Sequence, residues 1–215
     1  MSDEYSKIKK FIEKRPSRLR YEYESDYDQA AVLLPLLRTD EGPAVLFQVR
    51  SATLDWQPGE ICFPGGRMET GETAGAAALR ETCEELSVAA ADVEIYGPLD
   101  SLAAQMGMIV HPYVGRILAP EKIKPSRDEV AEVFTVPFER LLDMRPRVGK
   151  IKVVTQPADD DFPYDLLPGY FRGPRVRKIY DLYFYQYGKH VIWGLTARIL
   201  HDFLQGCLKC RQESK

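Results

Sequence analysis

Residues 65–88, GGRMETGETAGAAALRETCEELSV, decide how the rest of this sequence is interpreted. Two glycines open the stretch, and its second half is rich in alanine, leucine and glutamate, which favour helix. Thr73 is a candidate N-cap, so we predict a helix over residues 73–86. Side chains three and four residues apart lie on the same face of a helix. The helix therefore gathers three carboxylates on one face: Glu81, Glu84 and Glu85.

Three carboxylates on one face repel each other, by a few tenths of a kcal/mol per exposed pair and by more when buried. A divalent cation would offset this repulsion. Mg²⁺ suits the task because it binds through few carboxylates and keeps waters and positions for a phosphate. Gly65 and Gly66 allow the backbone just upstream to approach a ligand closely. The stretch thus favours a site for a metal-bound diphosphate, although the same glutamates could form a solvated acidic face paired with Arg80.

Strand and helix patterns surround this stretch on both sides. Apolar and β-branched segments predict strands over residues 30–37, 44–49, 60–64, 93–99, 109–118, 132–136 and 179–187. Helical spacing of apolar residues predicts helices over residues 4–14, 138–142 and 193–208. Strands dominate the middle and helices do not alternate with them regularly, which disfavours a doubly wound parallel sheet. The fold class is therefore α+β, an α-β-α layered arrangement around a mixed β-sheet.

We interpret residues 30–208 as the main domain, residues 1–29 as an N-terminal helix and extension, and residues 209–215 as a tail. Proline and charge in residues 143–178 predict a long loop or a lid over the pocket. Tyrosines at 183, 185 and 187 are interpreted as strand residues with outward rings rather than as a platform for a nucleobase.

Composition excludes several classes of protein. The 215 residues carry 29 Lys and Arg against 32 Asp and Glu, a formal charge of −3, which argues against general binding to nucleic acid or anionic membranes. The longest run without these charged residues, 101–115, is shorter than the ~20 residues that a spanning helix needs. The N-terminus has no apolar segment of the signal-peptide kind, and the four cysteines lack the spacing of a zinc site. We therefore expect a soluble, cytoplasmic protein with reduced thiols.

The spacing of charged residues in this stretch resembles the Nudix box, G-x5-E-x7-R-E-U-x-E-E-x-G-U, where U is a bulky aliphatic residue. The matching positions are Gly66, Glu72, Arg80, Glu81, Glu84, Glu85 and Val88. Two positions depart from the pattern: Thr82 occupies an aliphatic position and Ser87 replaces the last glycine. With Ser87 at this position, we expect a helix end without the usual left-handed glycine.

The resemblance implies a Nudix-type fold and assigns a role to each matching residue. Glu81, Glu84 and Glu85 would bind two or three Mg²⁺ or Mn²⁺ ions, with Gly66 close to the metal. Arg80 would orient the glutamates and would itself be held by Glu72. The implied reaction is hydrolysis of the diphosphate bond of a nucleoside diphosphate that is linked to another moiety, with metal-activated water as the nucleophile.

In this superfamily the general base lies either on the helix or in a loop outside it. Glu81 is the candidate on the helix, and Glu129 and Glu132 are the candidates in a loop.

The preceding residues 46–66, LFQVRSATLDWQPGEICFPGG, resemble the extra signature of the coenzyme A pyrophosphatase branch of this superfamily, L-L-T-x-R-[SA]-x3-R-x3-G-x3-F-P-G-G. This resemblance implies substrate binding by Arg50, Ser51, Phe63 and Gly65. Asp55 stands at a usually basic position, where it would repel a substrate phosphate, and Gln48 replaces the threonine. With Asp55 there, Arg50 is the nearest cation in the sequence for the 3′-phosphate of coenzyme A, although it could equally be a structural partner of Glu60 or Asp55.

The expected partner is therefore a small nucleoside diphosphate derivative, with coenzyme A first and ADP-ribose or NADH as alternatives. A Nudix domain that serves as a non-catalytic ligand sensor is the competing class, but such sensors commonly lose carboxylates that are intact here. We expect no nucleic-acid or membrane partner, and a homodimer is possible.

Overall fold

A computed structural model of the chain describes residues 4–14, 27–104, 107–157, 160–167 and 173–213. Its helices are α1 (Glu4–Lys14), α2 (Ala74–Leu86), α3 (Phe138–Asp143) and α4 (Gly194–Glu213), with short 3-10 turns η2 (Ala90–Asp92), η3 (Pro120–Lys122) and η4 (Tyr164–Leu166). Its strands are β1 (Asp28–Thr39), β2 (Gly42–Arg50), β3 (Ile61–Cys62), β4 (Gly65–Arg67), β5 (Val93–Pro98), β6 (Leu102–Ala104), β7 (Met108–Ile117), β8 (Val130–Pro137), β9 (Arg147–Thr155), β10 (Arg175–Tyr187) and β11 (His190–Ile192). Within the described residues, no helix is both long and apolar enough to cross a membrane.

The main sheet is mixed, as the sequence predicts. Its central order is β3-β2-β1-β7-β5, with β4 paired to β1, β6 to β7 and β8 to β2. Strands β1 and β7 run parallel, whereas the other pairs of this sheet are antiparallel. Strand β1 is therefore fully enclosed, and this explains why its apolar run is nearly continuous.

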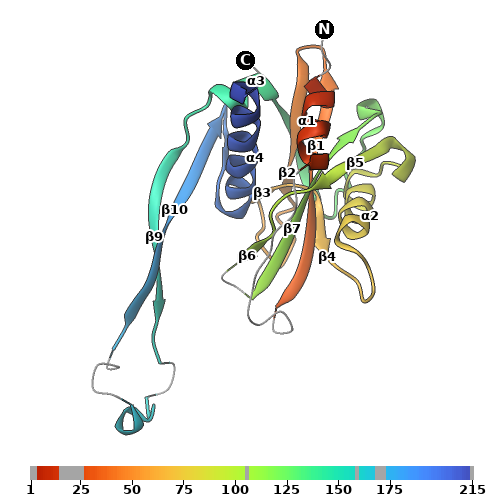
Figure 1. Ribbon diagram of the computed structural model, residues 1–215. Coiled ribbons are helices and arrows are strands. Elements are labelled where there is room, and N and C mark those ends of the chain that lie inside the picture. Colours follow the sequence, from red (N-terminus) through yellow and green to blue (C-terminus); the bar gives the residue numbers. More distant parts are fainter. Residues whose placement is uncertain (1–3, 15–26, 105–106, 158–159, 168–172, 214–215) are drawn as a thin grey trace.

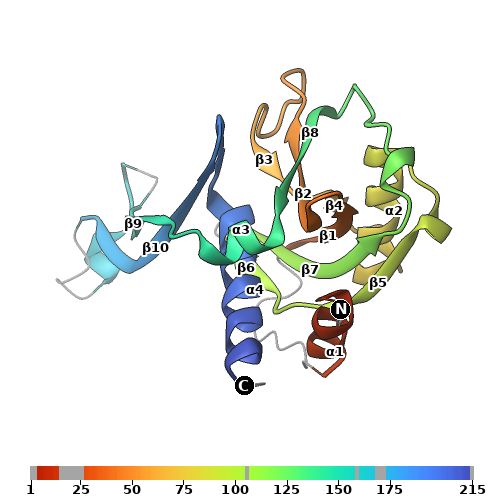
Figure 2. The same ribbon diagram turned by 90° about the horizontal axis from the view of Figure 1, so that it is seen from above.

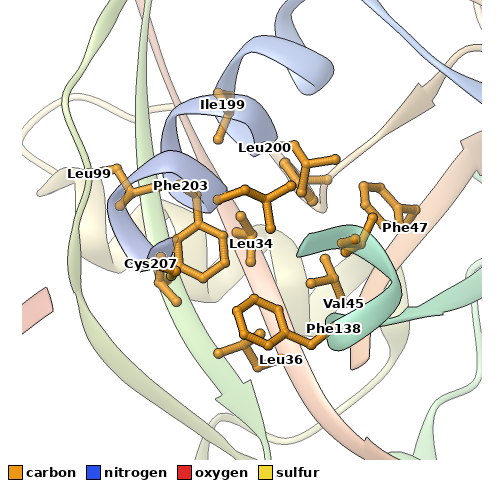
Figure 3. Packing of buried hydrophobic residues seen from close by; sticks show 14 of the residues in the cluster. Leu34, Leu36, Val45, Phe47, Leu99, Phe138, Ile199, Leu200, Phe203 and Cys207 are labelled. Carbon is orange, nitrogen blue, oxygen red and sulfur yellow. The ribbon is translucent and has the colours of Figure 1, made fainter. Parts of the chain in front are cut away.

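Helices cover both faces of this sheet. Alternating side chains of β1 enter different cores: Leu33 and Leu37 pack with the α2 side, whereas Leu34 and Leu36 pack with α1, α3 and α4. Figure 3 shows the second core, in which Phe138 of α3 and Phe203 and Leu200 of α4 close over Leu34 and Leu36. The predicted α-β-α layering is confirmed, with α2 on one side of the sheet and α1 and α4 on the other (Figure 1).

Helix α2 begins as predicted, because the Thr73 hydroxyl accepts a hydrogen bond from the Ala76 amide (3.3 Å). Its end lacks the usual glycine, as expected. Ser87 adopts the left-handed conformation itself, with φ 51° and ψ 43°, and its amide donates to the Cys83 carbonyl. The helix thus keeps the usual left-handed ending and accepts the steric strain of a side chain there.

The expected long loop or lid over residues 143–178 is wrong for residues 147–155 and 175–178, which are strand. Residues Arg147–Thr155 form β9, which pairs antiparallel with β10 in a ribbon of its own. This ribbon of β9 and β10, called the arm below, projects from the domain beside α4, on the other side of the sheet from α2 (Figures 1 and 2). At its base, the Tyr185 side chain is buried and the Tyr183 ring stacks on His201 of α4 at 3.9 Å, so these two rings do not point outward as expected.

Candidate active site

A single arginine organises the carboxylates on α2. The Arg80 guanidinium contacts both carboxylate oxygens of Glu72, from Nε and Nη2, each at 3.0 Å. Its Nη1 also donates to Glu81 at 2.8 Å and to Glu84 at 3.2 Å. These hydrogen bonds lower the pKa of Glu72 and raise that of Arg80. The structure therefore brings together Glu72, Arg80, Glu81 and Glu84, as the sequence predicts.

Glu85 lies on the same helix but faces the sheet, where only 3% of the residue is exposed. Its Oε2 accepts two hydrogen bonds of 2.9 Å, one from Gln48 Nε2 on β2 and one from the Gly65 amide. Burial raises the pKa of this carboxyl group to about 7, and the two hydrogen bonds oppose that rise. Glu85 is thus a carboxylate short of positive charge at neutral pH.

Gly66 fits directly against the side chain of Glu81. A Cβ atom at position 66 would lie 2.5 Å from the Glu81 carboxyl carbon, so no other residue fits without displacing that carboxylate. Burial, more than any other cause, raises the pKa of Glu81, and Arg80 opposes it. The predicted proximity of Gly66 to the acidic face is therefore present, and it is steric in origin.

A divalent metal suits the chemistry of these residues. Glu85 is buried and short of positive charge, Glu81 is half-buried, and the side-chain oxygen of Gln48 is buried without a hydrogen-bond partner. Within the described residues, no three His, Cys, Asp or Glu side chains are yet close enough to hold an ion. The carboxylate of Glu84 is paired with Arg80 in this arrangement. Metal binding by Glu84 would therefore require its exposed side chain to turn.

The two candidates for the general base outside the helix differ in their surroundings, and Glu132 lies in strand β8 rather than in a loop. The negative charge of Glu129 raises the pKa of both Glu81 and Glu85, which places its exposed carboxylate near them. Glu132 instead pairs with Lys189 at 2.9 Å and with His190 at 3.1 Å, and the hydrogen bond from Lys189 lowers its pKa. The structure therefore joins Glu129 to the carboxylate cluster and engages Glu132 elsewhere.

The predicted substrate-binding residues fall into two groups. Ser51 and Gly65 lie at the site, because the Ser51 amide donates to the Glu129 carbonyl at 2.8 Å and the Gly65 amide to Glu85. Arg50 starts the adjoining loop, 51–60, and its Nε donates to the Trp56 carbonyl at 3.1 Å. Phe63, by contrast, is only 2% exposed and stacks on Phe47, so it packs in the core here and its contact with substrate stays a prediction. An aromatic ring is fixed in the core there by the apolar packing around it.

Gln48 is the residue of this site that sequence reasoning missed. It was visible only as a departure from the threonine of the branch signature, yet its buried amide holds Glu85. A buried polar side chain inside the apolar strand AVLFQV was the available signal, because such groups need partners.

Comparisons with known proteins place the chain in a family. The NUDIX domain family model matches residues 27–155. Nudix hydrolase 3 of Caenorhabditis elegans is 36% identical over 84% of this chain and 74% of its own length. Human mitochondrial coenzyme A diphosphatase NUDT8 is 32% identical, covering 82% of this chain and 68% of its own. The Nudix hydrolase RenU from M. smegmatis aligns in structure with a TM-score of 0.45 and 26% identity, over 54% of this chain and 74% of that chain. The chain therefore belongs to the Nudix family and is a hydrolase that acts on diphosphate bonds.

Proposed function

We propose that this hydrolase cleaves the diphosphate bond of a nucleoside diphosphate derivative in a Mg²⁺- or Mn²⁺-dependent reaction, with coenzyme A as the first candidate substrate. Coenzyme A would yield 3′,5′-ADP and 4′-phosphopantetheine. The observation that carries the proposal is the group of Glu81, Glu84 and Glu85 beside Arg80 and Gly66. The coenzyme A diphosphatase activity in the name of the human relative supports the choice of substrate.

Glu81, Glu84 and Glu85 would hold the metal. When bound, the metal supplies Lewis-acid chemistry, polarising the diphosphate and lowering the pKa of a bound water. Arg80 positions Glu81 and Glu84, and Glu72 fixes Arg80 through a bidentate contact. Glu85 is oriented by Gln48 and the Gly65 amide. Preorganised carboxylates of this kind cost little reorganisation during the reaction.

Glu129 is the proposed general base that takes a proton from the attacking water. It is exposed, near Glu81 and Glu85, and anchored through its backbone to Ser51. Glu81 is the alternative, although its carboxylate is engaged by Arg80 in this structure.

The first experiment replaces single carboxylates in the full chain. Glu84→Gln and Glu85→Gln should each lower kcat roughly a hundredfold or more, because each removes a charged oxygen ligand and leaves an amide of the same shape. Asp40→Asn, an acidic residue in the β1–β2 turn, is the matched control and should leave kcat unchanged. Wild-type rates in both glutamine variants at saturating Mg²⁺ would remove the metal role.

A second experiment identifies the substrate. Chromatographic assays of the two phosphomonoester products from coenzyme A, dephospho-coenzyme A, ADP-ribose and NADH, each with Mg²⁺, with Mn²⁺ and with a chelator, separate the candidates. Binding of one compound without turnover under every metal condition would instead support the ligand sensor.

Arg50 is the proposed contact for the 3′-phosphate of coenzyme A, since Asp55 occupies the usual basic position. The arginine also holds the Trp56 carbonyl, so Arg50→Ala could act through the loop alone. A structural effect would lower kcat/KM equally for coenzyme A and dephospho-coenzyme A. Loss of phosphate recognition would lower it several-fold for coenzyme A only. A wild-type enzyme that treats both alike would point to another nucleoside diphosphate derivative.

The cellular location is a separate proposal. We keep the cytoplasm, as predicted from the sequence, whereas the name of the human relative gives a mitochondrial location for that protein. Imaging of the tagged full-length chain in its own cells distinguishes the two.

A further inference from the structure

Loop 51–60, which joins β2 to β3, carries an exposed tryptophan. Trp56 is 54% exposed, whereas Phe47 on β2 and Phe63 directly after β3 are buried. A tryptophan in water forgoes the stabilisation that burial of its large ring would bring. Single exposed rings are common on protein surfaces, so the surroundings of Trp56 decide what it does.

Hydrogen bonds fix the loop around this ring. Arg50 Nε donates to the Trp56 carbonyl at 3.1 Å, and the Arg50 carbonyl accepts from the Gly59 amide at 3.2 Å. Gln57, directly after the tryptophan, has a positive φ of 52°. Such a conformation costs energy for a residue with a side chain and clusters at ligand-binding segments. The Trp56 backbone is therefore preorganised, which lowers the entropy cost of binding a ligand.

A short series of contacts joins this loop to the carboxylates of α2. The Arg50 side chain hydrogen-bonds Cys62 as well as the Trp56 carbonyl. The Cys62 sulfur lies 3.6 Å from Gln48 Nε2, which in turn donates to Glu85 at 2.9 Å. The tryptophan is thus connected through side chains to the buried carboxylate of the site.

The start of the loop reaches the proposed general base. The Ser51 amide donates to the Glu129 carbonyl at 2.8 Å, and the β2–β3 loop lies beside the segment that leads into β8 (Figure 2). Loop 51–60 therefore touches both the residues that hold Glu85 and the residue proposed to activate water. A group that extends from a diphosphate bound at this site comes next to the loop.

We propose that the Trp56 ring stacks on the adenine ring of the substrate and makes loop 51–60 the adenosine subsite. This rests on the proposed function and adds the group that is recognised, because coenzyme A, dephospho-coenzyme A, ADP-ribose and NADH all contain adenosine 5′-diphosphate. Adenine and the 3′-phosphate of coenzyme A are carried by one ribose, so a base at Trp56 places that phosphate near Arg50. Stacking of a base on an aromatic side chain contributes substantially to binding.

Tryptophan fluorescence of the full chain, with Mg²⁺ present, tests the stacking directly. The chain holds two tryptophans, so Trp193→Phe leaves Trp56 as the sole emitter. AMP and 3′,5′-ADP are the adenosine products of the four candidate substrates. At least one of them should quench the emission saturably, whereas 4′-phosphopantetheine, which has no base, should not. Failure of both adenosine products to quench would overturn the proposal.

Substitutions separate the ring from the bulk of the side chain. Trp56→Phe keeps a ring, and Trp56→Leu keeps an apolar side chain without one. The dissociation constant of the bound adenosine product, measured by calorimetry, should rise less than about threefold in Trp56→Phe and roughly tenfold or more in Trp56→Leu. Trp193→Leu, the same change at the tryptophan that stacks on Phe184 of the arm, is the matched control and should leave the constant unchanged. Equal constants in Trp56→Phe and Trp56→Leu would overturn the proposal.

Steady-state kinetics distinguish failure of this proposal from failure of the proposed function. Hydrolysis of a candidate substrate with a KM raised roughly tenfold in Trp56→Leu, and kcat nearly unchanged, supports both. A lowered kcat with unchanged KM leaves the diphosphatase in place and overturns the stacking, because the loop then acts through Glu129. A chain that hydrolyses none of the four compounds refutes the proposed function, and the quenching and the calorimetry still decide whether Trp56 binds adenosine.

Discussion

At the residue scale, the pH dependence of the site depends on the buried carboxyl group of Glu85. Burial raises its pKa from 4.5 to about 7 in the folded protein. A raised carboxyl pKa means that the folded state holds the proton more tightly than the unfolded state. The resulting stability is full below the unfolded pKa and is lost as the pH rises toward the folded value.

We therefore expect the melting temperature of the metal-free protein to fall between about pH 5 and about pH 8 as Glu85 ionises. Mg²⁺ binds the ionised form and should raise the melting temperature more at the higher pH. Thermal unfolding with Mg²⁺ and with a chelator measures both effects. In Glu85→Gln the difference in Mg²⁺ gain between the two pH values should shrink, and an undiminished difference would assign it to another group.

The contact between Gly66 and Glu81 leads to a second prediction at this scale. Gly66→Ala places a methyl group 2.5 Å from the Glu81 carboxyl carbon, so the carboxylate must move. Turnover should fall roughly a hundredfold, because a misplacement of about 1 Å at a catalytic centre costs that much. Gly75→Ala on α2, where the nearest atom is a Tyr113 ring carbon at 3.2 Å, is the control. Circular dichroism should show both variants folded, and wild-type turnover of Gly66→Ala would show that Glu81 tolerates displacement.

At the element scale, the end of α2 stores strain that a single substitution can release. Ser87 is left-handed, with φ 51°, a conformation that costs a residue with a side chain about 1–2 kcal/mol. Ser87→Gly should therefore raise the free energy of unfolding by about 1 kcal/mol and the melting temperature by about 2–4 °C. Ser87→Ala keeps the strain and should give no such gain. Chemical denaturation of the three proteins decides the matter, and equal stability of the glycine and alanine variants would count against strain.

Local signals in the sequence made α2 predictable, whereas the arm lacks such signals and was not predicted. The cap, the composition and the spacing of the glutamates all lie within one stretch of sequence, and together they predict the helix. The arm segment 147–155, RVGKIKVVT, has apolar residues on both faces and fully buries neither, so it lacks the alternation that marks a half-buried strand. The proline-rich and acidic residues beyond it strengthened the loop interpretation.

Contacts between residues that are far apart along the chain could not be predicted from the sequence either. The hydrogen bond from Gln48 to Glu85 joins residues 37 positions apart, on β2 and α2. The stacking of Phe63 on Phe47 likewise depends on strand register, which no motif encodes. Spacing predicted which carboxylates share a face, whereas tertiary packing decided that Glu85 is buried and Glu84 exposed.

At the scale of the whole molecule, the sheet separates two structures of different character. Helix α2 and its carboxylates lie on one side, while α4 and the arm lie on the other (Figure 1). The arm contacts the domain at its base, through Tyr183 and Tyr185 beside His201 of α4. Its distal half lies far from the carboxylates of its own chain, so we do not expect it to cover that site.

Shortening the arm tests this separation. Residues 150–181 can be replaced by an Asn-Gly turn that joins Gly149 to Leu182, which already face each other across the ribbon. The buried base is retained, so the melting temperature should change little and kcat/KM for the identified diphosphate substrate should stay within about twofold of wild type. A tenfold rise of KM in the shortened chain alone, with its melting temperature unchanged, would return the arm to the role of a lid, because only a segment that covers bound substrate weakens binding without weakening the fold.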